Sequence, residues 1–271
     1  MKKSTFNIII ATFTVVLSIC FTSCKPDPDP DPTPQKVMLP AEIVFDNNHD
    51  GTMKGLVVKI TYDDKNRIAT LYRLYPSDDV PYHSVIGNFE YDSSGQLTKI
   101  TFKSEGGYET TQTTHYTYSD NFVTVTHAYS DSDSILSNQA KYELKDGRMI
   151  REFLYDNGTF QEFRTFSFDL SGNIIKISDQ ESSGTNYKLI SYENKKGVFS
   201  GINKPDWLLW NFWGLHLGYH SVNNPAKIEF QSDHGNYTIV YEYLIYNSND
   251  YPTKIKVDDL AEIEIKYIET K

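Results

Sequence analysis

The sequence predicts an all-β fold: a long antiparallel meander of about 15 short strands, rolled into a barrel-like sheet around one short aromatic helix or loop segment. Three observations predict it. A ten-residue motif typical of a β-hairpin occurs four times, apolar and polar residues alternate between turn signals, and Tyr supplies 20 of the 271 residues. A tyrosine packs with its ring while its hydroxyl stays hydrated, which suits strands with one buried and one exposed face.

The N-terminus has the pattern of a targeting segment. Two lysines precede an apolar run over residues 6–21 that is too short to span a bilayer comfortably, and the small Ser23 stands directly before Cys24. This resembles a bacterial lipoprotein signal, so we expect residues 1–23 to be a cleaved signal peptide and Cys24 to be lipidated. Cys20 is the weaker acceptor because the bulky Ile19 precedes it. An uncleaved membrane anchor is the disfavoured alternative.

Residues 24–37 form the lipidated cysteine and a tether in which Pro and Asp alternate, which favours an extended, stiff chain. Acidic residues after the cysteine resemble the surface-export signal of Bacteroidetes-type lipoproteins. We therefore expect the outer membrane, with the protein facing outward and the periplasmic face as the alternative. The lipid bilayer is then a partner through Cys24. Residues 38–271 form a single antiparallel β domain.

The charge of the chain excludes one class of partner. The whole sequence carries a formal charge of −10, and removal of residues 1–23, with two lysines and no acids, changes it to −12. So acidic a protein repels nucleic acid, which we exclude as a partner.

The clearest copy of the repeated motif is YDSSGQLTKI at 91–100, and altered copies occupy 62–71, 168–177 and 246–255. Each copy starts with an aromatic residue and Asp or Asn, the pattern of a type I turn closed by a left-handed residue. The residues expected at positive φ are Asn66, Gly95, Gly172 and Asp250. The motif therefore predicts repeated hairpins and carries no chemistry.

Between the hairpins, residues 123–129 and 262–267 alternate as half-buried strands do. A sheet this long with one apolar face must roll up, because twist would otherwise splay it. A membrane-spanning barrel is disfavoured, since strands such as 110–118 are polar.

The segment 204–220 breaks the strand pattern and is the expected filler. It holds all three tryptophans, spaced as on one short helix: Trp207, Trp210 and Trp213. Asp206 is the expected N-cap and Gly214 the expected end of that helix. Because the segment is apolar on nearly all sides, a buried plug is favoured. The alternative is that these rings form a ligand-binding surface that stacks on sugar or peptide.

At family level, the lipoprotein signal, the hairpins and YENKKGVFSGIN at 192–203 together resemble the Bacteroidetes surface lipoproteins of unknown function with a porin-like fold. The hairpin alone is similar to the YD-type repeats of Rhs-type proteins. The resemblance implies a long, partly rolled antiparallel sheet with no established activity and no catalytic residues to transfer.

Few residues suggest chemistry. DNNHDG at 46–51 matches the first half of a calcium loop, with Asp46, Asn48 and Asp50 as candidate ligands, but Val57 stands where the bidentate Glu belongs. A polar hairpin loop is favoured there. His216 and His220 have helical metal-ligand spacing without a nearby acidic ligand, which favours structural roles. Apart from calcium, we expect no cofactor.

No catalytic motif is present, so we expect a non-enzymatic binding or interaction module for extracellular glycan or protein. The alternatives are a glycan or peptide hydrolase and a structural subunit of the cell envelope or an adhesin.

Overall fold

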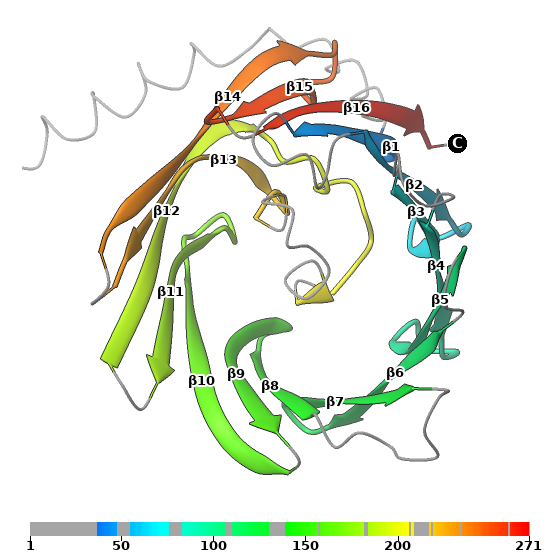
Figure 1. Cartoon of the computed structure of the whole chain (residues 1–271), viewed down its shortest axis with the longest axis vertical. Coiled ribbons are helices and arrows are strands. Elements are labelled where there is room, and N and C mark those ends of the chain that lie inside the picture. Colours follow the sequence, from blue (N-terminus) through cyan, green and yellow to red (C-terminus); the bar gives the residue numbers. More distant parts are fainter. Residues whose placement is uncertain are drawn as a thin grey trace, which may run out of the picture. The chain divides into compact units, whose positions relative to one another are not determined.

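The computed structural model shows a closed antiparallel β-barrel (Figure 1). The chain divides into two compact units, residues 1–35 and 36–271, and everything described below belongs to the second. The structure describes residues 37–47, 55–75, 83–106, 110–129, 139–156, 158–181, 184–205, 207–208, 217, 219–232, 235–259 and 261–270. The signal segment, Cys24 and nearly all of the tether lie outside these residues.

Within the described ranges, sixteen strands follow one another around the barrel in chain order, and β1 pairs with β16 to close it. They are β1 (Met38–Asn47), β2 (Leu56–Tyr62), β3 (Ile68–Tyr75), β4 (His83–Tyr91), β5 (Leu97–Glu105), β6 (Thr111–Ser119), β7 (Phe122–Tyr129), β8 (Gln139–Lys145), β9 (Arg148–Asp156), β10 (Thr159–Phe168), β11 (Ile174–Glu181), β12 (Gly184–Lys196), β13 (Asn223–Gln231), β14 (Tyr237–Tyr246), β15 (Pro252–Val257) and β16 (Ala261–Glu269). The predicted all-β meander is confirmed, and the sheet closes completely.

The strands alternate as the sequence predicts, with apolar side chains facing the interior. In β2, Leu56, Val58 and Ile60 are buried while Lys59 and Thr61 are exposed. Since successive side chains in a strand point to opposite faces, this places the hydrophobic core inside the barrel.

The two ends of the barrel differ. Neighbouring strands are antiparallel and follow one another in the chain, so the chain reverses direction at each strand. Every even-numbered strand therefore ends at the same end of the barrel at which β1 begins. All four repeated turns lie there, joining β2 to β3, β4 to β5, β10 to β11 and β14 to β15. We call this the collar end and the opposite one the loop end. The described chain also starts and finishes at the collar end, where Thr270 N donates to Val37 O over 3.0 Å.

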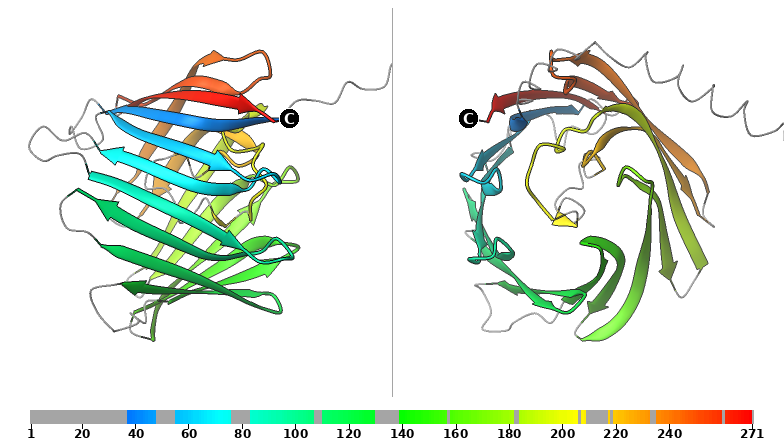
Figure 2. Two further views of the ribbon diagram at one scale, coloured as in Figure 1. Left: turned by 90° about the vertical axis from the view of Figure 1, so that its right-hand side faces the viewer. Right: turned by 180° about the vertical axis from the view of Figure 1, so that it is seen from behind.

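The connection from β12 to β13 turns into the barrel instead of crossing its rim (Figures 1 and 2). We call its described residues, within 197–222, the plug. Seven of its side chains are buried: Val198, Phe199, Ile202, Trp207, Leu208, Leu217 and His220. Trp207 reaches the opposite wall, with its ring centroid 5.0 Å from that of Tyr116 on β6 and 5.5 Å from that of Tyr142 on β8. The expected filler is therefore present.

Close backbone approach holds the two legs of the plug together. Gly197 N donates to Val222 O over 2.8 Å, and Phe199 N donates to His220 O over 3.0 Å. A Cβ atom added to Gly197 would lie 2.4 Å from the carbonyl oxygen of His220, so only glycine fits this position. The helix expected between Asp206 and Gly214 lies almost entirely outside the described residues, as do Trp210 and Trp213.

The repeated turns have the predicted backbone geometry. Their closing residues adopt φ of 60° at Asn66, 92° at Gly95, 97° at Gly172 and 65° at Asp250. In the second copy, Gly95 N donates to Asp92 O over 3.0 Å, and the carboxylate of Asp92 accepts from Gln96 N over 2.9 Å. The serine hydroxyl of Ser94 and these backbone donors lower the pKa of Asp92.

Polar contacts join one repeated turn to the plug and another to the strand residue that directly follows the plug. Asn203 N donates to Asn66 O over 3.0 Å, which ties the plug to the first repeated turn. Next to the other leg, Asn223 N at the start of β13 donates to the side-chain oxygen of Asn173, in the third repeated turn, over 2.9 Å, and Asn173 Nδ2 donates back to Asn223 Oδ1 over 3.0 Å. The repeat thus has a second role, since it fixes the plug in the barrel.

Tyrosines around the collar end repeat one hydrogen bond. In each case a tyrosine towards the end of an even-numbered strand donates its hydroxyl to a carbonyl oxygen near the start of the preceding strand. The pairs are Tyr62 with Pro40, Tyr91 with Ile68, Tyr118 with Leu97, Tyr192 with Ile174, Tyr243 with Pro225 and Tyr267 with Pro252, at 2.6–2.9 Å. Each ring packs against the core while its hydroxyl is satisfied, which explains the abundance of Tyr.

Candidate functional site

The candidate site is a group of charged and aromatic side chains on the inner wall between β9 and β14. Five of them stand two positions from a buried core residue on the same strand, so they point to the same face of the sheet as that residue. The pairs are Arg164 with Phe166, Asp179 with Ile177, Lys188 with Ile190, Phe230 with Ile228 and Tyr237 with Ile239. These side chains therefore face into the barrel. We call Glu152, Glu162, Arg164, Asp179, Lys188, Phe230 and Tyr237 the inner-wall site.

Arg164 on β10 is the centre of the ionic part. Its guanidinium lies 3.1 Å from Glu152 Oε2, 2.8 Å from Glu162 Oε1 and 3.0 Å from Asp179 Oδ1. Strand register explains the grouping, because Arg164 pairs directly with Glu152 on β9 and with Asp179 on β11. Burial acts to lower the pKa of Arg164, but the three carboxylates outweigh it and raise that pKa. The guanidinium is therefore held charged and fixed in position.

Lys188 extends the network to β12. Its Nζ lies 4.0 Å from Asp179 Oδ2 and 5.6 Å from the ring centroid of Phe230. Burial lowers the pKa of Lys188, and the negative charge of Asp179 partly offsets that effect. Solvent still reaches these groups, since the side chains of Arg164 and Lys188 are 26% and 23% exposed while Glu152 is only 2% exposed.

Two stacked aromatic rings complete the site near the loop end. Phe230 on β13 and Tyr237 on β14 are cross-strand neighbours, with ring centroids 4.1 Å apart and an interplanar angle of 10°. Tyr237 is 58% exposed, so one of its faces packs on Phe230 and the other meets solvent. Burial raises the pKa of Tyr219 in the plug, and the negative charge of Asp179 raises that pKa further. Tyr219 is therefore close enough to this site to sense its charge. The arrangement offers an aromatic face beside hydrogen-bond donors and acceptors.

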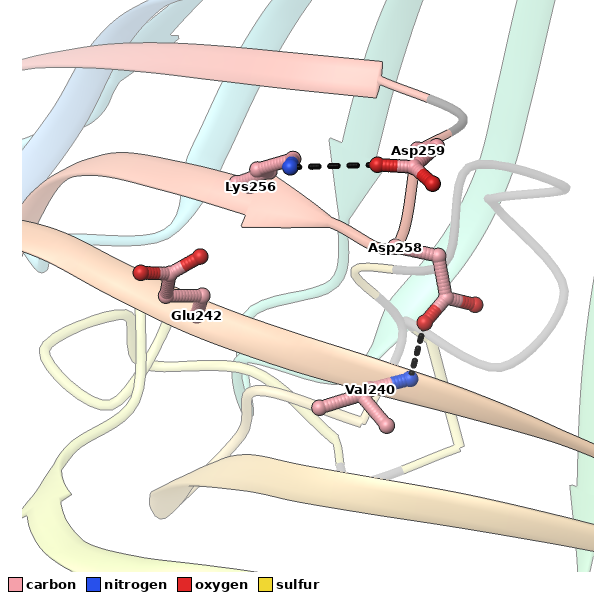
Figure 3. Close-up of a pocket in the computed structure, with 5 residues that line it drawn as sticks. All are labelled: Val240, Glu242, Lys256, Asp258 and Asp259. Carbon is pink, nitrogen blue, oxygen red and sulfur yellow. Dashed lines mark hydrogen bonds and ion pairs between the residues drawn. The ribbon is translucent and has the colours of Figure 1, made fainter.

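A second concave feature lies on the outer face, where β14 and the turn after β15 form an open hollow of about 390 Å³ (Figure 3). Val240, Glu242, Lys256, Asp258 and Asp259 line it. Asp258 Oδ1 accepts from Val240 N over 2.8 Å, and Lys256 Nζ lies 3.1 Å from Asp259 Oδ1. The first contact joins the β15–β16 turn to β14 and the second lies within β15 and that turn, so Asp258 and Asp259 have structural roles.

Of the site residues predicted from sequence, the two that the structure describes, Trp207 and Asp46, are not part of the inner-wall site. Trp207 is 1% exposed and lies in the core, where it has no free face for a ligand. Trp210 and Trp213 lie outside the described residues. So do Asn48 and Asp50, while Asp46 is exposed near the end of β1. In the described part of the chain, no cluster of three or more His, Cys, Asp or Glu residues could hold a metal ion. The calcium loop stays a prediction.

Of the two histidines with metal-ligand spacing, His220 is described. It is fully buried, and its ring nitrogens lie 3.2 Å from Leu217 O and 3.0 Å from the Tyr243 hydroxyl oxygen. Its neighbours are protein groups, in keeping with the structural role expected for it. His216 lies outside the described residues.

The sequence contains a local signal for the inner-wall site. A charged residue at the parity of the apolar residues marks an inward-facing charge, as in FRTFSF, where Arg164 alternates with Phe166. Other strands of the site also carry a charged residue two positions from a buried apolar one, as Asp179 with Ile177 and Lys188 with Ile190 do. Only the register of the four adjacent strands β9 to β12 shows that these charges meet.

Solved structures that are similar to this chain include two porin-like proteins. No curated protein matches the chain. A porin-like protein from Bacteroides uniformis ATCC 8492, known from a crystal structure, is 15% identical, with a TM-score of 0.44 over 77% of this chain and 100% of its own. A porin-like protein from Bacteroides vulgatus ATCC 8482 is 13% identical, with a TM-score of 0.38 over 85% of this chain and 99% of its own.

A family model described as a domain of unknown function (DUF4595) with porin-like fold matches residues 89–262. This range covers most of the barrel, from β4 to β16. The porin-like fold that the sequence resemblance implied is thus confirmed at the level of the family, and the family model itself is described as one of unknown function. The chain belongs to the family of DUF4595 domains of unknown function with porin-like fold.

Proposed function

We propose that the chain is an outer-membrane lipoprotein that carries its barrel outside the cell on a tether anchored at Cys24, and that it is a non-enzymatic binding module for glycan or protein. The observation that carries this proposal is the plug. A barrel whose interior holds seven buried plug side chains is suited to presenting a binding surface and unsuited to conducting solutes. Among the residues that the structure describes, no helix is long and apolar enough to cross a membrane.

The outer face of the strands supports a barrel that stands in water. Glu42 on β1 lies 2.7 Å from Lys266 on β16 and 3.8 Å from Lys59 on β2. Similar charge pairs join Lys254 to Glu262 at 2.8 Å and Lys99 to Glu90 at 2.6 Å. A lysine on the lipid-facing side of a membrane barrel costs about 2–4 kcal/mol at the bilayer midplane, so this outer face favours an aqueous environment.

A binding panel tests the proposed function. The full chain, solubilised in detergent, is heated with neutral and acidic oligosaccharides, mucin and candidate extracellular proteins. A ligand at one hundred times its dissociation constant stabilises the folded state by about 2.7 kcal/mol, a shift of several degrees in Tm for a domain of this size. No shift with any member, together with turnover of chromogenic glycosides or peptides, would favour the hydrolase instead.

Localisation requires a separate experiment. Protease added to intact cells should remove the barrel, and Cys24→Ala should release the protein from the membrane fraction because lipidation supplies the anchor. A barrel that resists protease until the outer membrane is permeabilised would place it at the periplasmic face. Retention of the Cys24→Ala variant in the membrane would contradict the lipid anchor.

A further inference from the structure

The geometry points to the inner-wall site as a binding site for a neutral sugar, with Tyr237 as the stacking platform and Glu162, Asp179 and Lys188 as hydrogen-bonding groups. This inference rests on the proposed binding function and gives it a location and a ligand class. The aromatic platform of this site lies on the β13–β14 hairpin, whereas Trp207 of the 204–220 segment is buried.

The aromatic pair has the form that sugar stacking needs. A pyranose ring presents a face of C–H groups that packs on the flat face of an aromatic ring. Phe230 covers one face of Tyr237 at a centroid distance of 4.1 Å and holds that ring in a single orientation. With 58% of its surface exposed, Tyr237 keeps the other face open to a ligand. A rigid aromatic supplies contact area at little cost in conformational entropy.

The polar groups beside this pair are fixed before any ligand arrives. Arg164 binds three carboxylates at 2.8–3.1 Å, so the side chains of Glu162 and Asp179 are oriented by the protein itself. Their exposed fractions are 22% and 14%, and that of Lys188 is 23%, so each remains within reach of solvent. Carboxylate oxygens accept from sugar hydroxyls and an ammonium donates to them, which allows recognition of both hydroxyl roles.

The charges favour a neutral polyol over other ligands. Three carboxylates face two cations in the cluster, so a phosphate or another anion meets excess negative charge. A purely apolar ligand would cover the polar groups without replacing their hydrogen bonds with water. A neutral, hydroxyl-rich ligand satisfies both the donors and the acceptors.

The test compares Tyr237→Ala with Phe160→Ala. Phe160 is a matched control, because it is an aromatic residue with 50% exposure that contacts Tyr155 edge to face and is not part of the inner-wall site. The probes are neutral oligosaccharides of defined composition, titrated calorimetrically into the full chain. We expect Tyr237→Ala to weaken binding at least tenfold and Phe160→Ala to change it less than twofold. Lys188→Gln, which removes the charge and leaves a shorter polar side chain, should weaken binding several-fold.

Two results would overturn the proposal. Equal sugar affinities of the wild type and the Tyr237→Ala variant would overturn the site while leaving a glycan-binding function intact. Binding of a protein or a cationic peptide such as oligolysine, without binding of any neutral sugar, would overturn the ligand class. Because all three variants lie on strands, their thermal unfolding is measured first, and a Tm that matches the wild type makes a loss of affinity specific to the site.

Discussion

A cation lies over an aromatic ring at three of the repeated turns around the collar end. The guanidinium carbon of Arg67 stands 4.1 Å from the ring centroid of Tyr91, that of Arg148 stands 5.7 Å from Phe168, and Lys195 Nζ stands 5.5 Å from Tyr246. Each cation also covers the left-handed residue of the same turn. Where that residue is Asp250 instead of glycine, the cation is a lysine that pairs with its carboxylate.

Gly172 therefore has two reasons to be glycine. Its φ is +97°, and an added Cβ atom would lie 2.9 Å from Arg148 Nη2. Gly147 has φ of +79° with nothing within 4 Å of an added Cβ atom, so it shares only the backbone requirement. We expect Gly172→Ala to lower the free energy of unfolding by about 1–2 kcal/mol and Gly147→Ala by about 1 kcal/mol. Urea unfolding of both variants measures the difference; a greater loss in Gly147→Ala would contradict the role of Arg148.

His220 gives the stability of the fold a dependence on pH. Burial lowers its pKa to about 3, against about 6.5 in an unfolded chain. The unfolded state therefore binds the extra proton first, and stability falls as pH decreases from about 6.5 towards 3, by up to about 1.4 kcal/mol per pH unit. Burial also lowers the pKa of His127, which acts in the same direction.

The contribution of His220 can be isolated above the range where carboxylates titrate. Urea unfolding at pH 7, 6 and 5 should show a clear loss of stability in the wild type and a smaller loss in His220→Gln. The variant is expected to be less stable at pH 7, because it loses the contacts with Leu217 and Tyr243, so the slope is the informative quantity. Equal slopes for both proteins would mean that His220 does not carry the pH dependence.

At this scale the sequence was informative, because turn chemistry is local. The positive φ of Asn66, Gly95, Gly172 and Asp250 follows from residues within four positions of each. The cations above the turns could not be predicted in this way. Arg148 reaches Phe168 from 20 residues away, and its place depends on the register of β9 and β10.

Among the elements, the plug contributes most to the hydrophobic interior after the strands themselves. Its apolar side chains fill the collar end, its first leg is hydrogen-bonded to the first repeated turn, and Asn223, which follows its second leg, is hydrogen-bonded to the third. Sequence reasoning identified a filler at 204–220 because that segment breaks the strand pattern. It missed the part from Gly197 to Asn203, whose buried Val198 and Phe199 appear in the sequence as a continuation of the preceding strand.

Trp207 tests whether the plug carries stability. Removing a buried aromatic side chain typically costs about 3–5 kcal/mol, because contacts are lost and a cavity remains. We expect Trp207→Ala to fall in that range by urea unfolding. Leu170→Ala is the matched control, since Leu170 is fully exposed in a turn and its loss should stay within about 0.5 kcal/mol. A cost below about 1 kcal/mol for Trp207→Ala would show that the plug is loosely packed.

For the whole molecule, closure depends on the pairing of β1 with β16, which joins residues more than 200 positions apart, such as Glu42 and Lys266. The sequence predicted a rolled sheet from its length and its single apolar face, but no local signal states that the first and last strands meet. The inner-wall site was missed for the same reason, because its residues come from strands between Glu152 and Tyr237. The periodicity of the sequence predicts which side chains of a strand face inward, whereas the pairing register decides which of them become neighbours.

A packed plug inside a closed barrel, held by contacts with the repeated turns, should open only together with the barrel. Hydrogen exchange of the native full chain, followed by mass spectrometry, measures this directly. Backbone donors in the plug, including Phe199 to His220 O and Asn203 to Asn66 O, should be protected to an extent similar to those of β12 and β13, because they open only when the barrel opens. Exchange of residues 197–205 at the rate of an unstructured peptide, while the strands stay protected, would contradict the account.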